Sequence, residues 1–308
     1  MYLFANNIDV EESWDNLTKK CKIILPYKAS FKNAYLVNSS ADAIFKRGDK
    51  INIRCGYFPK LTTIFQGYIS QINIDTPVEL ECEDEMWILK QTTTKKFTGT
   101  NIKLTTLLTA ILPPTVKFKA LDVNVGDWRI SDNANVSNVL EELRSKHSIF
   151  SQFIDGVLYV GLAVTGTVKQ NTEKFVFESQ IIDASDLKYQ LKEDVKVKIK
   201  VNVFYPDNKK VEPIEIGDPE GDLRTINLYN VPQADVVEIA KRELERVKYT
   251  GYHGSFLTFG EPYVRPGDIA NLYSSVIKDR NGNYLIKSVS RNWGMEGYRQ
   301  KIELETQV

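Results

Sequence analysis

Alternating apolar and polar residues mark much of the first 90 residues as short β-strands. In residues 78–83, Val78, Leu80 and Cys82 share one face while glutamates share the other, because successive side chains of a strand point to opposite faces. Further strands are expected over 21–25, 51–55 and 67–74, with Gly, Pro or Asp between them. Short strands at this spacing predict a small barrel or sandwich.

The apolar period changes to a helical one from about residue 91. One apolar stripe covers 102–111 and stops before Pro113, and a second covers 136–146. Asp155-Gly156 then lies between two apolar strands, which is a strong hairpin signal. We therefore expect residues 91–168 to form a small α+β insert domain.

Strict alternation returns at residues 195–203, where valine and isoleucine alternate with lysine and asparagine. Residues 206–222 are rich in Pro, Gly and acids and are expected to form a long loop. A helix is predicted near 235–247. Residues 169–308 are thus predicted to form a second β domain that carries one helix.

Segments 45–83 and 264–306 share four landmarks in the same order. Each has a Gly-Asp turn, a strand with an asparagine, a strand that begins near a glycine and a tyrosine, and a closing strand of alternating apolar residues and glutamates. The turns are Gly48-Asp49 and Gly267-Asp268, and the closing strands are 78–81 and 302–305. The predicted fold is therefore mainly β, with two similar small β-barrel (tube-type) domains, residues 1–90 and 169–308, flanking the α+β domain.

Composition and charge exclude several classes of protein. The 308 residues are 42% hydrophobic, which is ample for packed domains, and 40 basic residues balance 40 acidic ones. The basic excess of a nucleic-acid-binding groove is therefore missing. No apolar run approaches the ~20 residues that span a bilayer, and the acidic N-terminus does not resemble a signal peptide. We expect a protein made in the cytoplasm, with no membrane-spanning segment.

Catalytic chemistry finds little support in the sequence. Three cysteines without a CxxC pair are expected to be small buried hydrophobes, and neither of two histidines has a local catalytic signature. Glu79 and Glu81 lie on one exposed face, whereas a general acid needs burial. We expect no catalytic, cofactor or metal site, and no enzyme activity.

The second copy of the repeat carries a resemblance to a known family. The string PYVRPGDIANLY, followed by GNYLIKSVSRNWGMEGYRQKIELE, resembles the C-terminal barrel of phage tail baseplate hub proteins, the late-control D family, and the related hub portion of type VI secretion spike proteins. The matching positions are Gly267-Asp268, 284–286 and 289–291, and the hairpin at Asp155-Gly156 resembles the middle domain of the family. A histidine common in the family after the long strand is replaced by Arg291-Asn292-Trp293.

This resemblance implies a structural hub of a contractile, phage-tail-like baseplate in a virion, a prophage or a tail-like particle. It implies a homotrimer whose six similar barrels make a pseudo-six-fold ring, which adapts a three-fold spike to a six-fold tail tube. The expected partners are further copies of the chain, a tail tube protein, a separate spike protein, and DNA or an effector that passes through the lumen. Host and partner identities stay open, as do the job of the insert and whether the isolated protein is already trimeric.

Two alternatives remain at this stage. One is a cell-wall hydrolase of the same particle, and the other is a double barrel that binds carbohydrate or oligonucleotide. Within the hub hypothesis, the repeated glutamates give a further expectation, because alternation turns Glu79, Glu81, Glu303 and Glu305 away from the core. They either line an acidic channel or simply keep an outer strand soluble, pairing with lysines such as Lys196 and Lys198.

Overall fold

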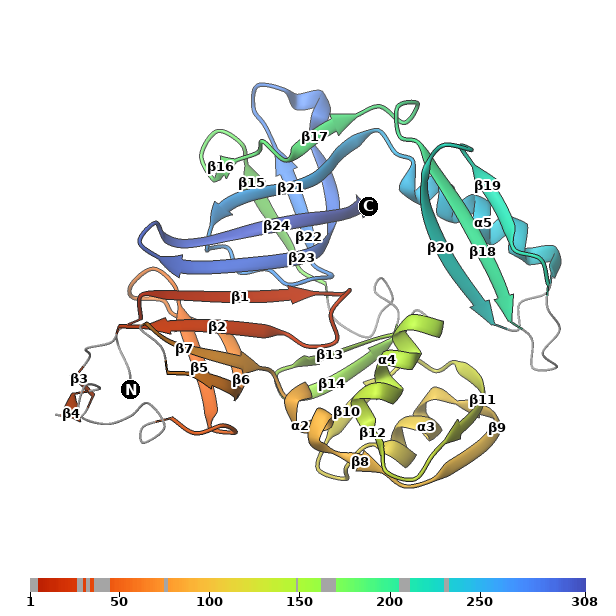
Figure 1. Ribbon diagram of the computed structural model, residues 1–308. Helices are drawn as coiled ribbons and strands as arrows, with labels where there is room; N and C mark the ends of the chain where they lie inside the picture. The colour runs from red at the N-terminus through yellow and green to blue at the C-terminus, as the bar shows by residue number, and fades with distance from the viewer. Residues whose placement is uncertain are drawn as a thin grey trace.

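The computed structural model describes residues 5–26, 30–31, 34–35, 45–74, 77–147, 149–161, 170–204, 211–229 and 233–308. Figure 1 shows two curved β regions lying against each other and two smaller units that contain the helices. The mainly β fold with an α+β insert is the fold class that the sequence predicts. None of the helices described is long and apolar enough to cross a membrane.

The first β domain is an antiparallel sheet in the order β1-β2-β7-β6-β5. Its core lies on the face that the alternation predicts and includes Val10, Ile23, Leu80 and all three cysteines, which are buried and free. The prediction that the cysteines are buried is thus confirmed. The strands are β1 (Asn7–Ser13), β2 (Lys20–Leu25), β5 (Lys50–Cys55), β6 (Thr62–Asn73) and β7 (Val78–Glu83), with the short pair β3 (Ser30–Phe31) and β4 (Ala34–Tyr35) beside them.

The second β domain has a similar path, in which β23 pairs with both β22 and β24, and β24 pairs with β21. Phe175, Phe256 and Tyr284 are the largest fully buried members of its core. The elements are β15 (Thr172–Val176), β16 (Ile181–Asp183), β17 (Leu187–Gln190), β21 (Gly251–Phe259), β22 (Ile269–Tyr273), η2 (Lys278–Arg280), β23 (Gly282–Gly294) and β24 (Gly297–Gln307).

The two β domains share one sheet. β1, near the start of the chain, pairs antiparallel with β23, near its end, so that a twelve-stranded sheet runs through both domains. Figure 1 shows β1 and β23 side by side at the middle of the molecule. The sequence pattern predicts the two domains but contains no signal for this join.

The insert domain packs three helices with short strands around one apolar core, which includes Leu104, Leu108, Leu140 and Leu158. Both predicted helices are confirmed, and so is the hairpin, where Asp155 and Gly156 have φ values of 49° and 76°. The elements are α2 (Met86–Gln91), β8 (Thr93–Thr94), β9 (Phe97–Lys103), α3 (Leu104–Ile111), β10 (Lys117–Ala120), β11 (Asn124–Ile130), β12 (Ala134–Asn135), α4 (Val136–His147), β13 (Phe150–Ile154) and β14 (Val157–Gly161).

A second α+β unit interrupts the second β domain between β17 and β21. Its strands β18 (Val197–Phe204), β19 (Ile214–Gly217) and β20 (Asp222–Tyr229) form a separate sheet, covered by α5 (Gln233–Val247). Ile199, Val201, Val236 and Ala240 are fully buried in a core of its own. The predicted strand and helix are both present, but part of the expected loop, 206–222, forms β19 instead.

Candidate assembly surface

Four hydrogen bonds close the turn at Gly48-Asp49, one of them from the Asp49 N–H to the Lys46 carbonyl (3.0 Å). The Gly48 N–H donates to the Ile69 carbonyl (2.8 Å), and the Ile69 N–H donates back to the Asp49 carbonyl (2.9 Å). The Asp49 carboxylate accepts from the Lys46 N–H (2.8 Å). Gly48 has a φ of +90°, in the left-handed region that favours glycine.

The turn at Gly267-Asp268 repeats this arrangement bond for bond. The Gly267 N–H donates to the Ile286 carbonyl (2.8 Å), and the Ile286 N–H donates to the Asp268 carbonyl (2.9 Å). The Asp268 carboxylate accepts from the Arg265 N–H (2.8 Å), and the φ of Gly267 is +91°. The four turn residues singled out in the sequence thus occupy two turns of one geometry.

The same correspondence continues along the next strands. β6 has a register shift between Ile69 and Gln71, and β23 has one between Ile286 and Ser288. Such a bulge inserts one extra residue and turns the strand locally. Directly after it, Gln71 lies opposite Glu81, and Ser288 lies opposite Glu303.

This register corrects the sequence alignment of the closing strands by two residues. Glu81 corresponds to Glu303, and Glu79 corresponds to Lys301 rather than to Glu303. A shift of two residues leaves each side chain on the same face of the sheet. The two closing strands therefore bury equivalent faces, but a glutamate of one, Glu79, corresponds to a lysine of the other, Lys301.

Cations neutralise three of the four singled-out glutamates, all of which turn away from the core. The Lys22 Nζ lies 3.0 Å from Glu79, and the Lys287 Nζ lies 3.2 Å from Glu303. Arg224 approaches Glu305 at 3.8 Å, whereas Glu81 is exposed on the open sheet. The partners are not the lysines suggested by the sequence, since Lys198 pairs with Glu215.

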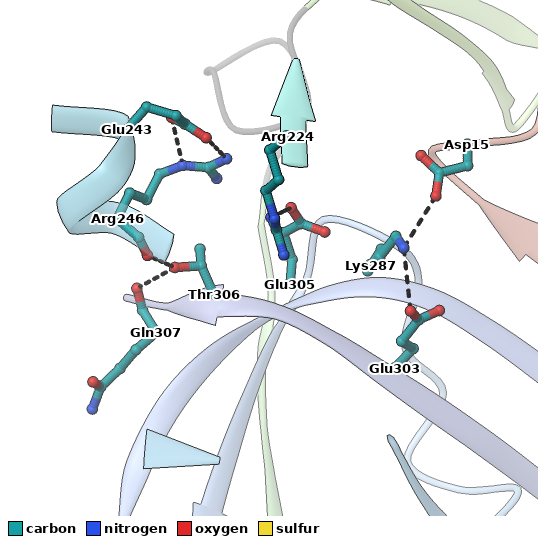
Figure 2. Close-up of polar contacts among 9 residues, drawn as sticks. All are labelled: Asp15, Arg224, Glu243, Arg246, Lys287, Glu303, Glu305, Thr306 and Gln307. Atoms are coloured by element: carbon teal, nitrogen blue, oxygen red, sulfur yellow. Dashed lines mark hydrogen bonds and ion pairs between the residues drawn. The ribbon is translucent and has the colours of Figure 1, made fainter. Parts of the chain in front are cut away.

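Figure 2 shows how the end of β24 connects three parts of the chain. Lys287 lies between Asp15 (3.1 Å) and Glu303, and the Thr306 hydroxyl donates to the Arg246 carbonyl at the end of α5 (2.6 Å). Arg224, on β20, approaches Glu305 from the separate sheet. A hollow of about 390 Å³ lies among these groups. These contacts attach the second α+β unit to the sheet.

The seam between β1 and β23 contains a buried ion pair. Arg291 is 1% exposed, and its guanidinium donates to the Glu12 carboxylate (3.1 Å) and to the Val264 carbonyl. Burial alone raises the pKa of Glu12, but Lys19 and Arg291 outweigh it and hold that pKa at about 2. Arg291 stands where the family resemblance expects a histidine, and the Tyr263 ring lies 4.4 Å from its guanidinium carbon. Glu12 had no sequence signal of its own.

Each of the two histidines stacks on an aromatic ring. His147 stacks on Trp128, and burial lowers its pKa to about 4, so its ring is neutral near pH 7 rather than a cation at the end of α4. His253 stacks on Tyr249 at 4.1 Å, and burial lowers its pKa as well. Within the described part of the chain, no three His, Cys, Asp or Glu side chains are grouped to hold a metal ion.

Comparison with known proteins identifies the fold. No family model matches the sequence, and no curated protein matches it. Among solved structures, the chain is similar to a tail protein from Neisseria meningitidis MC58, with a TM-score of 0.64 and 11% identity over 100% of this chain and 93% of the other. A 43 kDa tail protein of prophage MuSo2 from Shewanella oneidensis gives a TM-score of 0.61 and 13% identity, over 99% and 94%.

A component of the type VI secretion system of E. coli, described as structurally similar to T4 bacteriophage tail proteins, is also similar to this chain. Its TM-score is 0.59 at 9% identity, over 98% of this chain and 73% of the other. At such identities the likeness establishes the fold. The fold implied by the resemblance of residues 264–306 is thereby confirmed.

Proposed function

Because this chain has the fold of phage tail proteins, we propose that it is the structural hub of a phage-tail-like baseplate. Three copies form a ring of six similar β domains, which adapts a three-fold spike to a six-fold tail tube. The observation that carries the proposal is the hydrogen-bond pattern shared by the turns at Gly48-Asp49 and Gly267-Asp268, because a pseudo-six-fold ring needs two equivalent domains in each chain.

The outer face of the shared sheet is proposed to line the channel of this ring. It carries acids such as Glu81 and Glu303, and bases such as Lys22 and Lys301, on neighbouring strands. A surface of interspersed charges has no strong single-sign field to hold a passing chain or phosphate backbone. The lumen is therefore expected to be polar and weakly adhesive rather than uniformly acidic.

The glutamates singled out in the sequence give no support to the hydrolase alternative. The candidate carboxylates lie on an open sheet face, and Glu79, Glu303 and Glu305 each have a cation beside them. A general acid needs a buried, unpaired carboxyl group. We therefore propose a role without catalysis or cofactor, in the baseplate of a virion or tail-like particle.

The test is the mass and shape of the assembly. Light scattering of the purified chain, alone and with its spike and tube proteins, is expected to give a trimer, and electron microscopy is expected to show rings with six lobes. The direction of Glu81 and Glu303 in such a ring tests the channel. A chain that stays a monomer or dimer with both partners present contradicts the hub, and side chains that point outward contradict only the channel.

A further inference from the structure

One edge of the shared sheet lies open in the first β domain. Gln71, Ile72 and Asn73 pair with β7 on one side, and in the described part of the chain no strand pairs with their other side. The corresponding residues of β23 begin at Ser288, and they are paired on both sides, with β24 and with β1. The two equivalent edges therefore differ in one respect, which is whether a strand covers them.

A groove of about 570 Å³ lies along the open edge, between residues 45–47 and residues 70–72. In the second domain the corresponding space lies between residues 264–266 and 287–289. The end of β1 occupies it there. Ser13 lies opposite Ser288, and the backbone N–H of Trp14 donates to the Lys287 carbonyl (3.4 Å). The chain thus shows, within itself, what kind of element fits this groove.

The strand that corresponds to β1 in the second domain is β17. Lys22 lies opposite Glu81, and Ser255 lies opposite the equivalent Glu303, so that β21 corresponds to β2. Two residues earlier on each of these strands, His253 of β21 corresponds to Lys20 of β2.

The same step gives the partner strands. His253 pairs with Lys188 of β17, and Lys20 pairs with Glu11 of β1. Lys188 of β17 therefore corresponds to Glu11 of β1. The far side of β17 also has no strand partner in the described chain.

Exposed apolar side chains flank both open edges. Ile74, at the position equivalent to Arg291, is 45% exposed, whereas Arg291 is covered by β1 and is 1% exposed. Beside the other edge, Ile182 and Leu191 are 43% and 52% exposed. Apolar groups beside an unpaired strand edge are characteristic of a site that another strand covers.

We propose that β17 of one copy adds to the open edge of β6 in the next copy, antiparallel, with Lys188 opposite Asn73 and Gln190 opposite Gln71. The inference rests on the proposed trimer and gives the contact that closes it. The register is that of β1 on β23, transferred by the equivalences above. Repeated three times, the contact extends the sheet of each chain into the sheet of its neighbour.

The charges around the two seams support this choice of partner. Across the internal seam, Glu11 of β1 faces Ser290, whose other neighbour is Lys301. Across the proposed seam, Lys188 faces Asn73, whose other neighbour is Glu79. In both seams an acid and a base thus lie two strands apart, about 10 Å. The added strand carries the acid in the internal seam and the base in the proposed seam.

The exchanged signs also disfavour the wrong pairing. If β1 of one copy added to β6 of another, Glu11 would lie opposite Asn73, and the acids Glu11 and Glu79 would lie two strands apart, about 10 Å. If β17 added to β23, Lys188 would lie beside the strand of Lys301. Like charges across a seam act against mistaken partners more strongly than correct pairs add to affinity.

Disulfide trapping tests the register in the full chain. Lys188→Cys and Asn73→Cys in one chain are expected to give a covalent trimer under mild oxidation, since directly opposed residues bring their Cβ atoms within reach of a disulfide. The matched control is Lys188→Cys with Glu79→Cys, which lies on the same face but one strand further away. The native cysteines are buried, and the unsubstituted chain measures their background.

A charge exchange provides the second measurement. Lys188→Glu is expected to reduce the trimer fraction at least threefold at low salt, and Lys188→Glu with Glu79→Lys is expected to restore it. A trimer that forms without the in-register disulfide, or that forms it equally in the control pair, overturns the β17–β6 seam and leaves the hub intact. A chain that forms no trimer with spike and tube present overturns the hub and the seam together.

Discussion

Replacing Glu12 by glutamine tests the energetic role of the buried ion pair between β1 and β23. The pKa of Glu12 is held at about 2, against 4.5 for an unperturbed glutamate. Each pH unit of difference is worth about 1.4 kcal/mol, so the ionised form stabilises the fold by about 3 kcal/mol. Glu12→Gln removes this contribution and leaves the Arg291 guanidinium buried without its counter-charge, so we expect a loss of about 3 kcal/mol at pH 7.

The contribution of Glu12 to the free energy of unfolding is also expected to depend on pH. Because the pKa of Glu12 is lower in the folded than in the unfolded chain, its stabilisation is complete above about pH 4.5 and disappears as the pH falls toward about 2. The variant lacks this contribution, so the difference between the two proteins is expected to shrink over that window.

The assay is urea unfolding followed by tryptophan fluorescence, since Trp14 and Trp293 flank the seam. Glu11→Gln is the matched control, because the same chemical change falls on the exposed face of the same strand and is expected to cost less than about 0.5 kcal/mol. Adding Arg291→Met to Glu12→Gln is expected to recover part of the loss. Equal stability of the Glu12→Gln and Glu11→Gln variants would refute the reasoning.

Three further predictions follow from burial and backbone geometry. Burial raises the pKa of Asp84 from 3.8 to about 7, so stability is expected to fall by up to about 1.4 kcal/mol per unit as the pH rises through that window, and Asp84→Asn should flatten this dependence in urea unfolding at pH 5 and 7. Alanine at Gly267 is expected to cost more than alanine at Gly48 in thermal unfolding. Both glycines have a positive φ, but a Cβ added at Gly267 would lie 2.6 Å from the Trp14 ring, whereas one added at Gly48 would lie 3.3 Å from the Trp87 ring. A larger loss of stability for Gly48→Ala than for Gly267→Ala contradicts this argument. Burial raises the pKa of all three cysteine thiols, so a thiol reagent at pH 8 should label them only in denaturant, and rapid labelling of the native protein contradicts their burial.

Local patterns predict most of the individual elements of this fold. The alternation in 78–83, the apolar stripe of 136–146 and the Asp155-Gly156 turn each follow from the geometry of a strand, a helix or a hairpin, and each is present. The repeated Gly-Asp turns could be found because a left-handed φ favours glycine in both copies.

The elements that join the parts could not be predicted in the same way. β1 escaped detection because Glu12 occupies a position that points toward the core, where the alternation calls for an apolar residue. Of its two counter-charges, Arg291 is 279 residues away. The parallel pairing of β18 with β20 likewise depends on a contact across a connection, so the separate core around Ile199 had no local signal. Sequence periodicity reports which face of an element is buried, but not against which distant element it is buried.

The pairing of the first strand with one of the last has a consequence for synthesis of the chain on the ribosome. The first β domain can fold early, yet the strand that covers the outer edge of β1 is complete only when Gly294 has been made. At about 5–20 residues per second, the intervening stretch of roughly 280 residues takes about 15–60 s to translate. During that interval β1 presents a bare edge in a crowded cell, next to other nascent chains with the same edge. Asp9 and Glu11 place two acids along β1, and because charges on a strand disfavour its pairing with another chain, we expect them to limit premature association until the C-terminal strands arrive.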